Sequence, residues 1–464
     1  MSIRFGTSGW RAVIADDFTF TGVRAVTEAI CKLFARSEQR SDLMIVAHDT
    51  RFLGERFAAE SAGVIAARGF RALLATGATP TPALSHAIRT QNAICGINFT
   101  ASHNPPEYNG MKLSTGDGAP ALPEITQQVE SLIDLTESTR QETSSEPSYS
   151  SFDPKADYLA DLSSKIRFDL IASSGGRYAF DPLWGTGRGY LDELLRSHRV
   201  RVDTIHDWRD VLFGGRSPEP ESSHLDELRG VVLENNCTLG MATDGDSDRF
   251  GVIDSNGTFI TPNQLIALLF DYLIESRKWV GGVARSVATS HLVDRVAKAH
   301  GLPVYETPVG FKYIGELINE DKIVLGGEES AGLSIKGHYP EKDGILACLL
   351  AAEAVASRGS SLTAQLEALY GRFGKVESAR IGVRLTPQLM GSLSTRLAQD
   401  PDSIAGRRVE STNRIDGVKF MFADGSWLLM RPSGTEPLVR IYAESESKKD
   451  LEVLLDQGRK YLLG

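Results

Sequence analysis

Patterns typical of buried strands alternate with amphipathic patterns of helical spacing through most of this chain. The alternation begins with a helical pattern at residues 21–36 and a strand pattern at 42–49, and it continues to a helical pattern at 362–373. Strands that alternate with helices usually form parallel βαβ units. The sequence therefore predicts an α/β protein, and it excludes disorder, collagen-like repeats and a small disulfide scaffold as descriptions of the whole chain.

Two changes of texture divide the 464 residues. Residues 136–154 are rich in Ser, Thr, Glu and Pro and have no hydrophobic period, which is typical of a linker or a surface loop. From about residue 374, strand patterns follow one another and a single helical pattern ends the chain, as in an α+β module. We expect three related α/β domains and a C-terminal α+β domain, with boundaries at 1–150, 151–256, 257–373 and 374–464.

Composition limits the partners and the compartment. The chain has 50 Lys and Arg against 60 Asp and Glu, a net charge of −10, so its surface as a whole does not attract nucleic acid or anionic membrane, although a local basic cleft stays open. The start has no signal-peptide pattern, and the most apolar stretches are short and carry an acid. We expect a cytoplasmic protein without membrane or nucleic-acid partners. Four scattered cysteines without a CxxC pair predict buried, reduced thiols: Cys31, Cys95, Cys237 and Cys348.

A serine follows the strand pattern at 93–101, where a βα loop would leave the carboxyl end of a sheet. Ser102 lies beside a proton carrier, His103, in the segment TASHNPPEYNGMKLS. Ligand sites of open α/β sheets lie at this edge, so Ser102 is a candidate functional residue. The alternative is a turn serine whose hydroxyl binds the backbone. The chain has no GxSxG motif, so hydrolase-type acyl transfer is not supported.

Three aspartates alternate in the segment MATDGDSDRFG. Asp244, Asp246 and Asp248 offer hard oxygen ligands that suit Mg²⁺ or Ca²⁺. An EF-hand would need glycine and glutamate where the chain has Arg249 and Ser255, so that reading is excluded. Three protein oxygens leave coordination positions for a phosphoryl oxygen. The segment therefore predicts a metal site, and a solvated acidic turn is the alternative.

Two later loops carry groups that suit a phosphorylated sugar. In KIVLGGEESAG, Glu328 and Ser330 offer a carboxylate and a hydroxyl that can bind adjacent sugar hydroxyls, unless they form an ordinary helix N-cap. In RPSGTEPLVRIYAE, a guanidinium, two hydroxyls and backbone N–H groups suit a phosphate cradle, unless they form a plain turn between strands. The residues of this second loop are Arg431, Ser433, Gly434 and Thr435, with Arg440 as a further cation.

Together these loops resemble those of the α-D-phosphohexomutase superfamily, which includes phosphoglucomutases, phosphomannomutases and phosphoglucosamine mutases. The motifs TASHNP, DGDSDR, GEES and RPSGTEP occur in the family's order at widely separated positions, so the resemblance covers nearly the whole chain. It implies four domains around a central cleft: three related α/β domains and a fourth that resembles the TATA-binding protein.

The resemblance also implies a mechanism and residue roles. Ser102 would be the phosphoserine that gives and receives the phosphoryl group, and it would hold Mg²⁺ together with the three aspartates. The reaction would pass through a bisphosphorylated sugar, with glucose 1,6-bisphosphate as activator. Arg431, Ser433, Gly434, Thr435 and Arg440 would bind the phosphate that is not transferred, and Glu328 and Ser330 the sugar hydroxyls. The groups expected near the transferred phosphoryl are Arg11, His103, Lys112 and Arg249, of which His103 is a candidate for handling a proton.

The segment TPVGFKYIGEL determines sugar choice in this family, which implies that Thr307, Gly310 and Lys312 contact the substrate. Phe311-Lys312 and the EKDG segment at 341–344 resemble phosphoglucomutases more than phosphomannomutases, and GEESAG differs from the GEQSGH usual in phosphoglucosamine mutases. We expect a monomer or homodimer that interconverts glucose 1-phosphate and glucose 6-phosphate. The alternatives are dual glucose and mannose specificity, a glucosamine substrate, a sugar-phosphate-binding protein without activity, and a metal-dependent phosphatase.

Overall fold

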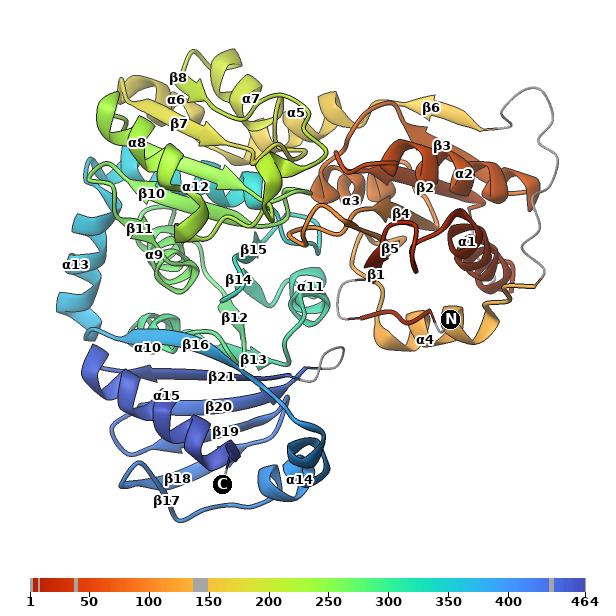
Figure 1. The fold of residues 1–464 in the computed structure, drawn as a ribbon. Helices are drawn as coiled ribbons and strands as arrows, with labels where there is room; N and C mark the ends of the chain where they lie inside the picture. The colour runs from red at the N-terminus through yellow and green to blue at the C-terminus, as the bar shows by residue number, and fades with distance from the viewer. Residues whose placement is uncertain (1–2, 7–8, 37–40, 137–148, 434–437, 464) are drawn as a thin grey trace.

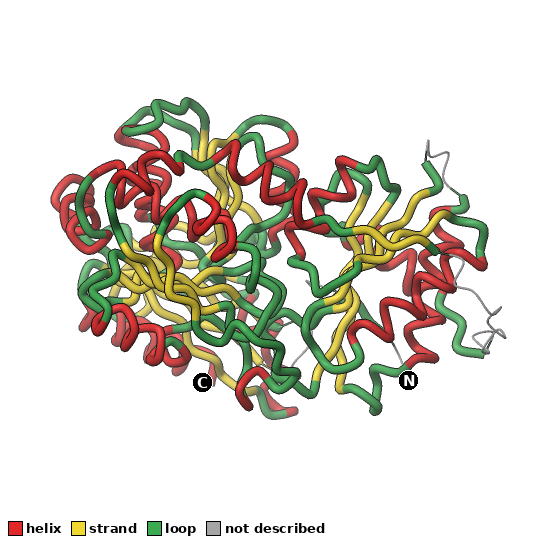
Figure 2. Tube along the Cα trace, turned by 90° about the horizontal axis from the view of Figure 1, so that it is seen from above, coloured by secondary structure: helices red, strands yellow, loops and turns green. Residues whose placement is uncertain are grey.

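The computed structural model describes residues 3–6, 9–36, 41–136, 149–433 and 438–463. This part of the chain contains four sheets, of six, five, four and six strands. Figure 1 shows the first sheet with its helices on the right, the second and third on the left, and the last at the bottom. Seen from above, in Figure 2, the first domain stands beside the others with loops facing the space between them. Three α/β domains and a C-terminal antiparallel-sheet domain are confirmed.

The first sheet is mixed rather than purely parallel, in the order β1-β5-β4-β2-β3-β6. β2, β3, β4 and β6 are parallel, whereas β5 runs antiparallel to both β4 and β1. The strands are β1 (Trp10–Val13), β2 (Leu43–His48), β3 (Arg71–Ala75), β4 (Cys95–Phe99), β5 (Tyr108–Thr115) and β6 (Ser150–Phe152). The helices are α1 (Phe20–Phe34), α2 (Gly54–Ala67), α3 (Thr81–Thr90) and α4 (Pro123–Leu132).

Two of these strands were not predicted. β5 lies in a segment predicted to be a loop after β4. The strand is largely buried, and its register with β4 pairs Lys112 with Asn98. β6 lies within residues 136–154, which were expected to be a linker or surface loop. It adds to the edge of the sheet through parallel pairing with β3, while residues 137–148 lie outside the described part.

The second sheet has the order β11-β10-β9-β7-β8, with β7, β8 and β9 parallel. Its strands are β7 (Arg177–Asp181), β8 (Arg201–Thr204), β9 (Leu239–Thr243), β10 (Phe250–Asp254) and β11 (Phe259–Ile260). The helices of this region are α5 (Lys155–Lys165), α6 (Phe168–Ser173), α7 (Leu191–Ser197) and α8 (Asp226–Glu234), with short 3₁₀ turns η1 (Phe213–Gly215) and η2 (Ser222–His224).

The third sheet has the order β13-β12-β14-β15, in which only β15 is antiparallel to its neighbour. Its strands are β12 (Gly282–Ser286), β13 (Val304–Thr307), β14 (Ile323–Glu328) and β15 (Gly332–Ile335). Its helices are α9 (Pro262–Glu275), α10 (Leu292–Ala299), α11 (Phe311–Asn319), α12 (Gly344–Arg358) and α13 (Leu362–Phe373).

The last sheet is antiparallel throughout, in the order β16-β21-β20-β19-β18-β17. Its strands are β16 (Glu377–Arg384), β17 (Ser403–Ile404), β18 (Arg407–Asn413), β19 (Val418–Phe422), β20 (Trp427–Pro432) and β21 (Leu438–Ser445). The sequence predicts one helix here, but there are two, α14 (Pro387–Leu397) and α15 (Lys448–Leu463). Thr386 caps α14 by accepting a hydrogen bond from the Leu389 N–H at 3.3 Å, an N-cap signal present in the sequence.

The cores differ in extent. One continuous apolar cluster spans the second and third domains, from Tyr158 to Val376, and includes Ala83 of the first domain, whereas the first and last domains have further cores of their own. α12 is the central helix of the shared core and is buried over most of its length. In the described residues no single helix is long and apolar enough to cross a membrane, and α12 with α13 passes that test only as a pair bent by 78°. All four cysteines are unpaired and buried.

Candidate active site

Loops after three parallel strands bring the predicted site residues together. Ser102 follows β4, Asp244 follows β9, and Glu328 ends β14. Ser102 has a left-handed backbone, with φ of 52°, and its side chain is buried. Its Oγ donates a hydrogen bond to Asp244 Oδ2 at 2.6 Å. The turn-serine alternative is therefore not what the structure shows, because this hydroxyl binds a carboxylate of another domain rather than the backbone.

The three aspartates form a compact and fully buried group. One oxygen from each lies within 4.8 Å of the others, and Asp244, Asp246 and Asp248 are all 0% exposed. Burial and the two neighbouring carboxylates raise the pKa of Asp244 well above its usual value. A solvated acidic turn is excluded by this burial.

Buried cations from two other domains approach the aspartates. Lys112 Nζ of β5 donates to Asp246 Oδ2 at 2.5 Å and to Asp248 Oδ2 at 2.6 Å. Lys342 Nζ lies 2.6 Å from the same Asp248 oxygen. Thr81, at the start of α3, donates to Asp246 Oδ2 at 2.5 Å. The first, second and third domains therefore meet at this group, and the two lysines neutralise part of its charge.

The remaining oxygens fit a bound divalent cation. Oδ1 of Asp246 and Oδ1 of Asp248 are buried and have no hydrogen-bond partner, a costly arrangement unless a ligand satisfies them. Hard carboxylate oxygens in this number suit Mg²⁺, which commonly completes its shell with water or phosphate. A second acidic group, Asp271, Glu275 and His300, is also compact. However, both Asp271 oxygens are already bound by arginines, so the triad is the better cation site.

Two arginines predicted to steady the phosphoryl group flank the serine loop. Arg11 Nη1 of β1 donates to Asn104 Oδ1 at 2.7 Å. The Arg249 backbone N–H donates to Asp244 Oδ1 at 3.0 Å, and its guanidinium pairs with Glu219 at 3.3 Å. The Nε atoms of both arginines are buried without a hydrogen-bond partner. Each side chain thus keeps an N–H group that can donate a hydrogen bond to a bound anion.

His103 adjoins the serine hydroxyl in surroundings that favour the neutral imidazole. Its Nδ1 lies 3.3 Å from Ser102 Oγ. Burial, with Arg249 and Arg11 nearby, holds the pKa of His103 well below its usual value. A neutral imidazole in this position can accept a proton.

The segment predicted to bind sugar hydroxyls contains a buried carboxylate, Glu328. Its Oε1 accepts a hydrogen bond from the Gly310 N–H at 2.7 Å, where Gly310 has φ of 131°. Burial and the adjacent Glu329 carboxylate raise the pKa of Glu328 to about 7. Ser330 follows, and the chain then enters the strand β15 rather than a helix. The N-cap alternative for this loop is therefore wrong.

The neighbouring segment contributes unevenly. Thr307 is buried and its hydroxyl donates to the Pro308 carbonyl at 3.0 Å, so it is turned toward the backbone. Burial lowers the pKa of Lys312, at the start of α11, whereas the charge of Glu328 acts to raise it. Phe311 packs in a core cluster with Ile314. Of the Phe311-Lys312 pair, the lysine is therefore the residue available to a ligand.

The predicted phosphate cradle lies at the junction of β20 and β21. Arg431 Nε donates to Asp416 Oδ2 at 2.7 Å, and the same oxygen accepts from the Val309 N–H at 3.0 Å, which ties the cradle to the third domain. Arg440 is the cross-strand neighbour of Arg431, and the Ser433 N–H donates to the Leu438 carbonyl at 2.7 Å. Gly434 and Thr435 lie outside the described residues.

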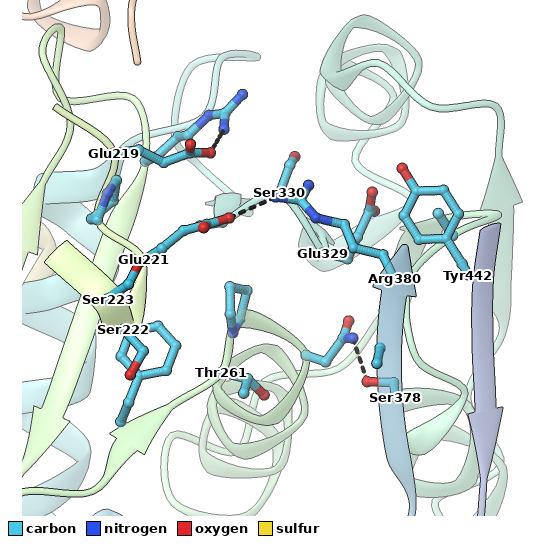
Figure 3. Close-up of a pocket in the computed structure, with 18 of the residues that line it drawn as sticks. Glu219, Glu221, Ser222, Ser223, Thr261, Glu329, Ser330, Ser378, Arg380 and Tyr442 are labelled. Atoms are coloured by element: carbon cyan, nitrogen blue, oxygen red, sulfur yellow. Dashed lines mark hydrogen bonds and ion pairs between the residues drawn. The ribbon is translucent and has the colours of Figure 1, made fainter. Parts of the chain in front are cut away.

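A cavity of about 470 Å³ lies between the second, third and last domains. Arg249 and Ser330 line it together with Tyr442 of β21. Figure 3 shows Arg380 of β16 reaching across it to Glu221, an ion pair of 2.6 Å. This volume can hold a small polar ligand, and the cavity is continuous with residues predicted to bind sugar and phosphoryl groups.

Two residues of the site were not predicted. Thr81 had no signal beyond its place at the start of a helix. Lys342 lies in the EKDG segment, whose resemblance to phosphoglucomutases indicated only the substrate class. Its position in the sequence could have indicated a role, because Lys342 directly precedes Asp343, the N-cap of the apolar helix α12. A lysine at the start of a buried helix lies at the edge of the core.

Comparisons with known proteins decide the family. Models of the four phosphoglucomutase/phosphomannomutase domains match in order: α/β/α domain I at residues 2–140, domain II at 156–257, domain III at 261–373 and the C-terminal domain at 388–460. The chain belongs to the α-D-phosphohexomutase superfamily. It is a phosphohexomutase, an intramolecular phosphotransferase that isomerises its substrate.

Relatives with similar sequence identity to this chain are named for different substrates. A phosphoglucomutase/phosphomannomutase of Thermococcus kodakarensis is 30% identical over 99% of this chain and 98% of its own length. A phosphoglucomutase of Komagataeibacter xylinus is 29% identical over 96% of this chain and 87% of its own. A Methanosphaera stadtmanae protein provisionally named phosphoglucosamine mutase is 29% identical over 99% and 98%. These identities establish the reaction class but do not separate the sugars.

Solved structures agree on the fold. A crystal structure from Thermus thermophilus, provisionally described as a phosphomannomutase, superposes over the full length of both chains with a TM-score of 0.87 and 33% identity. An N-acetylphosphoglucosamine mutase from Aspergillus fumigatus, in complex with GlcNAc-6P and magnesium, covers 100% of this chain and 96% of its own with a TM-score of 0.57 and 14% identity. The second likeness concerns the fold alone.

Proposed function

We propose that this phosphohexomutase interconverts glucose 1-phosphate and glucose 6-phosphate through a phosphorylated Ser102. The observation that carries the proposal is the 2.6 Å contact between Ser102 Oγ and Asp244 inside the buried aspartate group. A hydroxyl held beside three carboxylates and two lysines suits phosphoryl transfer, which depends chiefly on alignment and on neutralised oxygens.

The proposed cycle uses Ser102 twice. The phosphorylated serine gives its phosphoryl group to the free hydroxyl of the sugar. A neutral His103 accepts the hydroxyl proton and passes it to the Ser102 oxygen from which the phosphoryl group has left. The resulting glucose 1,6-bisphosphate, also the activator, turns so that its other phosphate faces Ser102. That second phosphoryl group then moves to the serine, the serine proton passes through His103 to the sugar oxygen that loses the phosphoryl group, and the product leaves.

The charged groups have distinct proposed roles. Ser102, Asp244, Asp246 and Asp248 would hold Mg²⁺, which when bound supplies charge neutralisation and orientation to the phosphoryl oxygens. Arg11, Lys112 and Arg249 hold the transferring group in line. Glu328, Ser330, Gly310 and Lys312 bind the sugar. Arg431, Ser433, Gly434, Thr435 and Arg440 bind the phosphate that is not transferred.

The glucose preference rests on Lys312 and Glu328. Lys312 supplies a cation beside a carboxylate with a pKa of about 7, so the pair offers both a donor and an acceptor to neighbouring sugar hydroxyls. The Thr307 hydroxyl donates to the backbone, which supports a role for this residue in shaping the loop rather than in binding the sugar. Dual glucose and mannose specificity is the second candidate, because the Thermococcus relative carries both names.

Three further expectations belong to the proposal. The division at 1–150, 151–256, 257–373 and 374–464 stays a prediction, although β6 of the first sheet and β11 of the second sheet extend past the first two boundaries and the second and third domains share a core. The protein is a monomer or homodimer. A cytoplasmic location is supported by its four unpaired cysteines.

The test compares kcat/KM for glucose 1-phosphate, mannose 1-phosphate and glucosamine 1-phosphate, with Mg²⁺ and a trace of the matching bisphosphate. We expect a preference for glucose of at least about tenfold, which corresponds to about 1.4 kcal/mol. Comparable values for glucose and mannose would support dual specificity instead, and a glucosamine preference would overturn the assignment. Release of inorganic phosphate would indicate a phosphatase, and binding without turnover a sugar-phosphate-binding protein.

A further inference from the structure

We propose that Arg51 is a positioning residue for the phosphoryl-carrying serine. Its guanidinium holds residues 102–108 in the conformation that directs Ser102 Oγ at Asp244, so the inference rests on the proposed role of Ser102. Arg51 follows β2 and its side chain is 0% exposed. Its hydrogen bonds go to Asp49 and to the loop rather than to the aspartate group. Its charge also acts on Asp246 and Asp244, but Arg51→Lys keeps this charge, so the effect tested here passes through the backbone of the loop.

Every donor of this guanidinium is used. Arginine has five side-chain N–H groups in a fixed planar fork, and one of them, at Nε, donates to Asp49 Oδ2 at 3.1 Å. The other four donate to backbone carbonyls of one loop: Nη2 to Ser102 at 2.7 Å and Asn104 at 2.6 Å, and Nη1 to Pro105 at 2.8 Å and Tyr108 at 3.0 Å. One side chain therefore sets the path of the whole loop.

A second route holds the other backbone group of the serine. The Ser102 N–H donates to Thr100 Oγ1 at 2.8 Å, and the Thr100 hydroxyl donates to Asp49 Oδ2 at 2.7 Å. Asp49 in turn accepts from the Arg51 backbone N–H at 2.8 Å and from its Nε. Both backbone polar groups of Ser102 are thus anchored to one buried ion pair, through the carbonyl directly and through the amide by way of Thr100.

This anchoring matters because the backbone of Ser102 is left-handed, with φ of 52°. A residue other than glycine adopts that conformation only where its surroundings hold it. Relaxation of the loop would move Ser102 Oγ away from Asp244, and a misplacement of about 1 Å can reduce a reaction rate about 100-fold.

The second domain closes over the same guanidinium. The Phe213 ring lies 4.9 Å from the Arg51 guanidinium carbon and is 0% exposed. Arg209 of the same segment pairs with Glu55 at 2.9 Å and donates to the Thr50 carbonyl at 3.4 Å. The domain that supplies the aspartates therefore packs on the residue that positions the serine, which couples the two loops that must meet.

The test uses two variants and a control on full-length protein. Arg51→Lys keeps the charge but has three donors instead of five, and Thr100→Val removes the bridge at nearly constant shape. Arg71→Gln is the control, because Arg71 of β3 lies in the same domain, is 67% exposed and pairs with Asp42 rather than with the loop. Each protein is phosphorylated with glucose 1,6-bisphosphate. Transfer to glucose 1-phosphate is then followed in a single turnover, together with hydrolysis of the phosphoserine and the dissociation constant of glucose 1-phosphate.

We expect transfer to fall about 100-fold in Arg51→Lys and about tenfold in Thr100→Val, with substrate binding within about twofold. The rate of phosphoserine hydrolysis should rise relative to the rate of transfer, and Arg71→Gln should match the parent protein. Wild-type transfer per phosphorylated molecule in Arg51→Lys, even with lowered stability, would overturn the inference, because a merely structural residue changes only the folded fraction. If Arg51→Lys does not fold, Thr100→Val decides in the same way. Failure of the parent protein to carry phosphate on Ser102 would overturn the proposed function instead.

Discussion

Three carboxylates without access to water meet two lysines at one point of the second domain. Lys112 and Lys342 occupy Oδ2 of Asp246 and Asp248, but Oδ1 of each has no partner. The two free oxygens and the raised pKa of Asp244 are the features of a group built around an additional cation. A residue-scale test therefore asks what this group binds.

We expect chelation of divalent metal to abolish turnover and added Mg²⁺ to restore it. Asp246→Asn should raise the Mg²⁺ concentration for half-maximal activity at least about tenfold, because loss of a group at a metal site typically costs about 10–100-fold in affinity or activity. Glu275→Gln is the control, since Glu275 belongs to the other acidic group. An unchanged Mg²⁺ dependence in Asp246→Asn would place the metal elsewhere.

The buried Glu328 predicts a pH dependence of stability. Its pKa is about 7 in the folded protein and about 4.5 when unfolded, so the folded state binds more protons between these values. The free energy of unfolding therefore falls as pH rises from about 4.5 to about 7, by on the order of 3 kcal/mol at most. Glu328→Gln lacks this loss, and its melting temperature should exceed that of the parent by more at about pH 8 than at about pH 5. A difference that is constant with pH would contradict the shift.

The same residue predicts a pH dependence of activity. Ionised Glu328 accepts hydrogen bonds from sugar hydroxyls, so kcat/KM should rise between about pH 6 and about pH 8, as the free enzyme ionises. The substrate phosphate titrates in this range too, and comparison with Glu328→Gln separates the two, since only the substrate contribution survives in the variant. Identical pH profiles would remove Glu328 from sugar binding.

At the scale of elements, the sequence was informative wherever hydrophobic periodicity and a loop motif coincide. β4, β9 and β14 are apolar strands of three different sheets, and each leads to a predicted motif. The residue pattern could therefore place Ser102, Asp244 and Glu328 at the carboxyl ends of strands, whereas their meeting was implied only by the family resemblance. β5 could not, because its eight residues are interrupted by asparagine, glycine and lysine, and its strand character depends on pairing with β1 and β4.

Residues that act through tertiary contacts could not be predicted from the sequence either. Arg51 sits in HDTR without a periodic signal, and its four carbonyl partners lie at positions 102–108. Lys342 reaches an aspartate 94 residues earlier in the chain. Spacing along the chain cannot reveal such pairs, because the distance between them is set by the packing of whole domains.

The start of α12 fixes the loop that carries the aspartates, which gives a test at this scale. A Cβ at Gly344 would lie 2.1 Å from the Arg249 carbonyl oxygen and 2.6 Å from its carbon. Gly344→Ala must therefore displace one of the two backbones. We expect a loss of about 2–3 kcal/mol in the free energy of unfolding and a higher Mg²⁺ concentration for half-maximal activity.

Gly371 in α13 provides the matched control, because a Cβ there meets nothing within 4 Å. Gly371→Ala should be neutral or stabilise the protein by up to about 1 kcal/mol, as expected for a helix interior. Thermal or chemical unfolding and Mg²⁺ titration compare the two variants. Equal behaviour of both would show that α12 does not support the aspartate loop.

At the scale of the whole molecule, the last domain reaches the second across the cavity through Arg380 and Glu221. Both side chains are about half exposed, so the pair should contribute no more than about 1 kcal/mol to stability. Its expected effect is on the relative position of the domains. Glu221→Ala and Arg380→Ala should each raise KM several-fold with nearly unchanged melting temperature.

The double variant distinguishes a shared contact from separate effects. Because both changes break the same ion pair, we expect the KM of the double variant to match that of either single variant. Steady-state kinetics of the four proteins measure this directly. Multiplied effects would show that each residue acts independently, for instance by touching the ligand itself.

The central claim is that one serine carries the phosphoryl group, and the most direct measurement labels it. The protein is incubated with glucose 1,6-bisphosphate carrying a radiolabelled phosphoryl group and Mg²⁺, quenched, and mapped, in parallel with Ser102→Ala. The account predicts label on Ser102 alone, none on the variant, and transfer of the label to sugar phosphate during a chase with glucose 1-phosphate, at least as fast as turnover. Label on another residue, or label that stays on the protein while turnover proceeds, would contradict it.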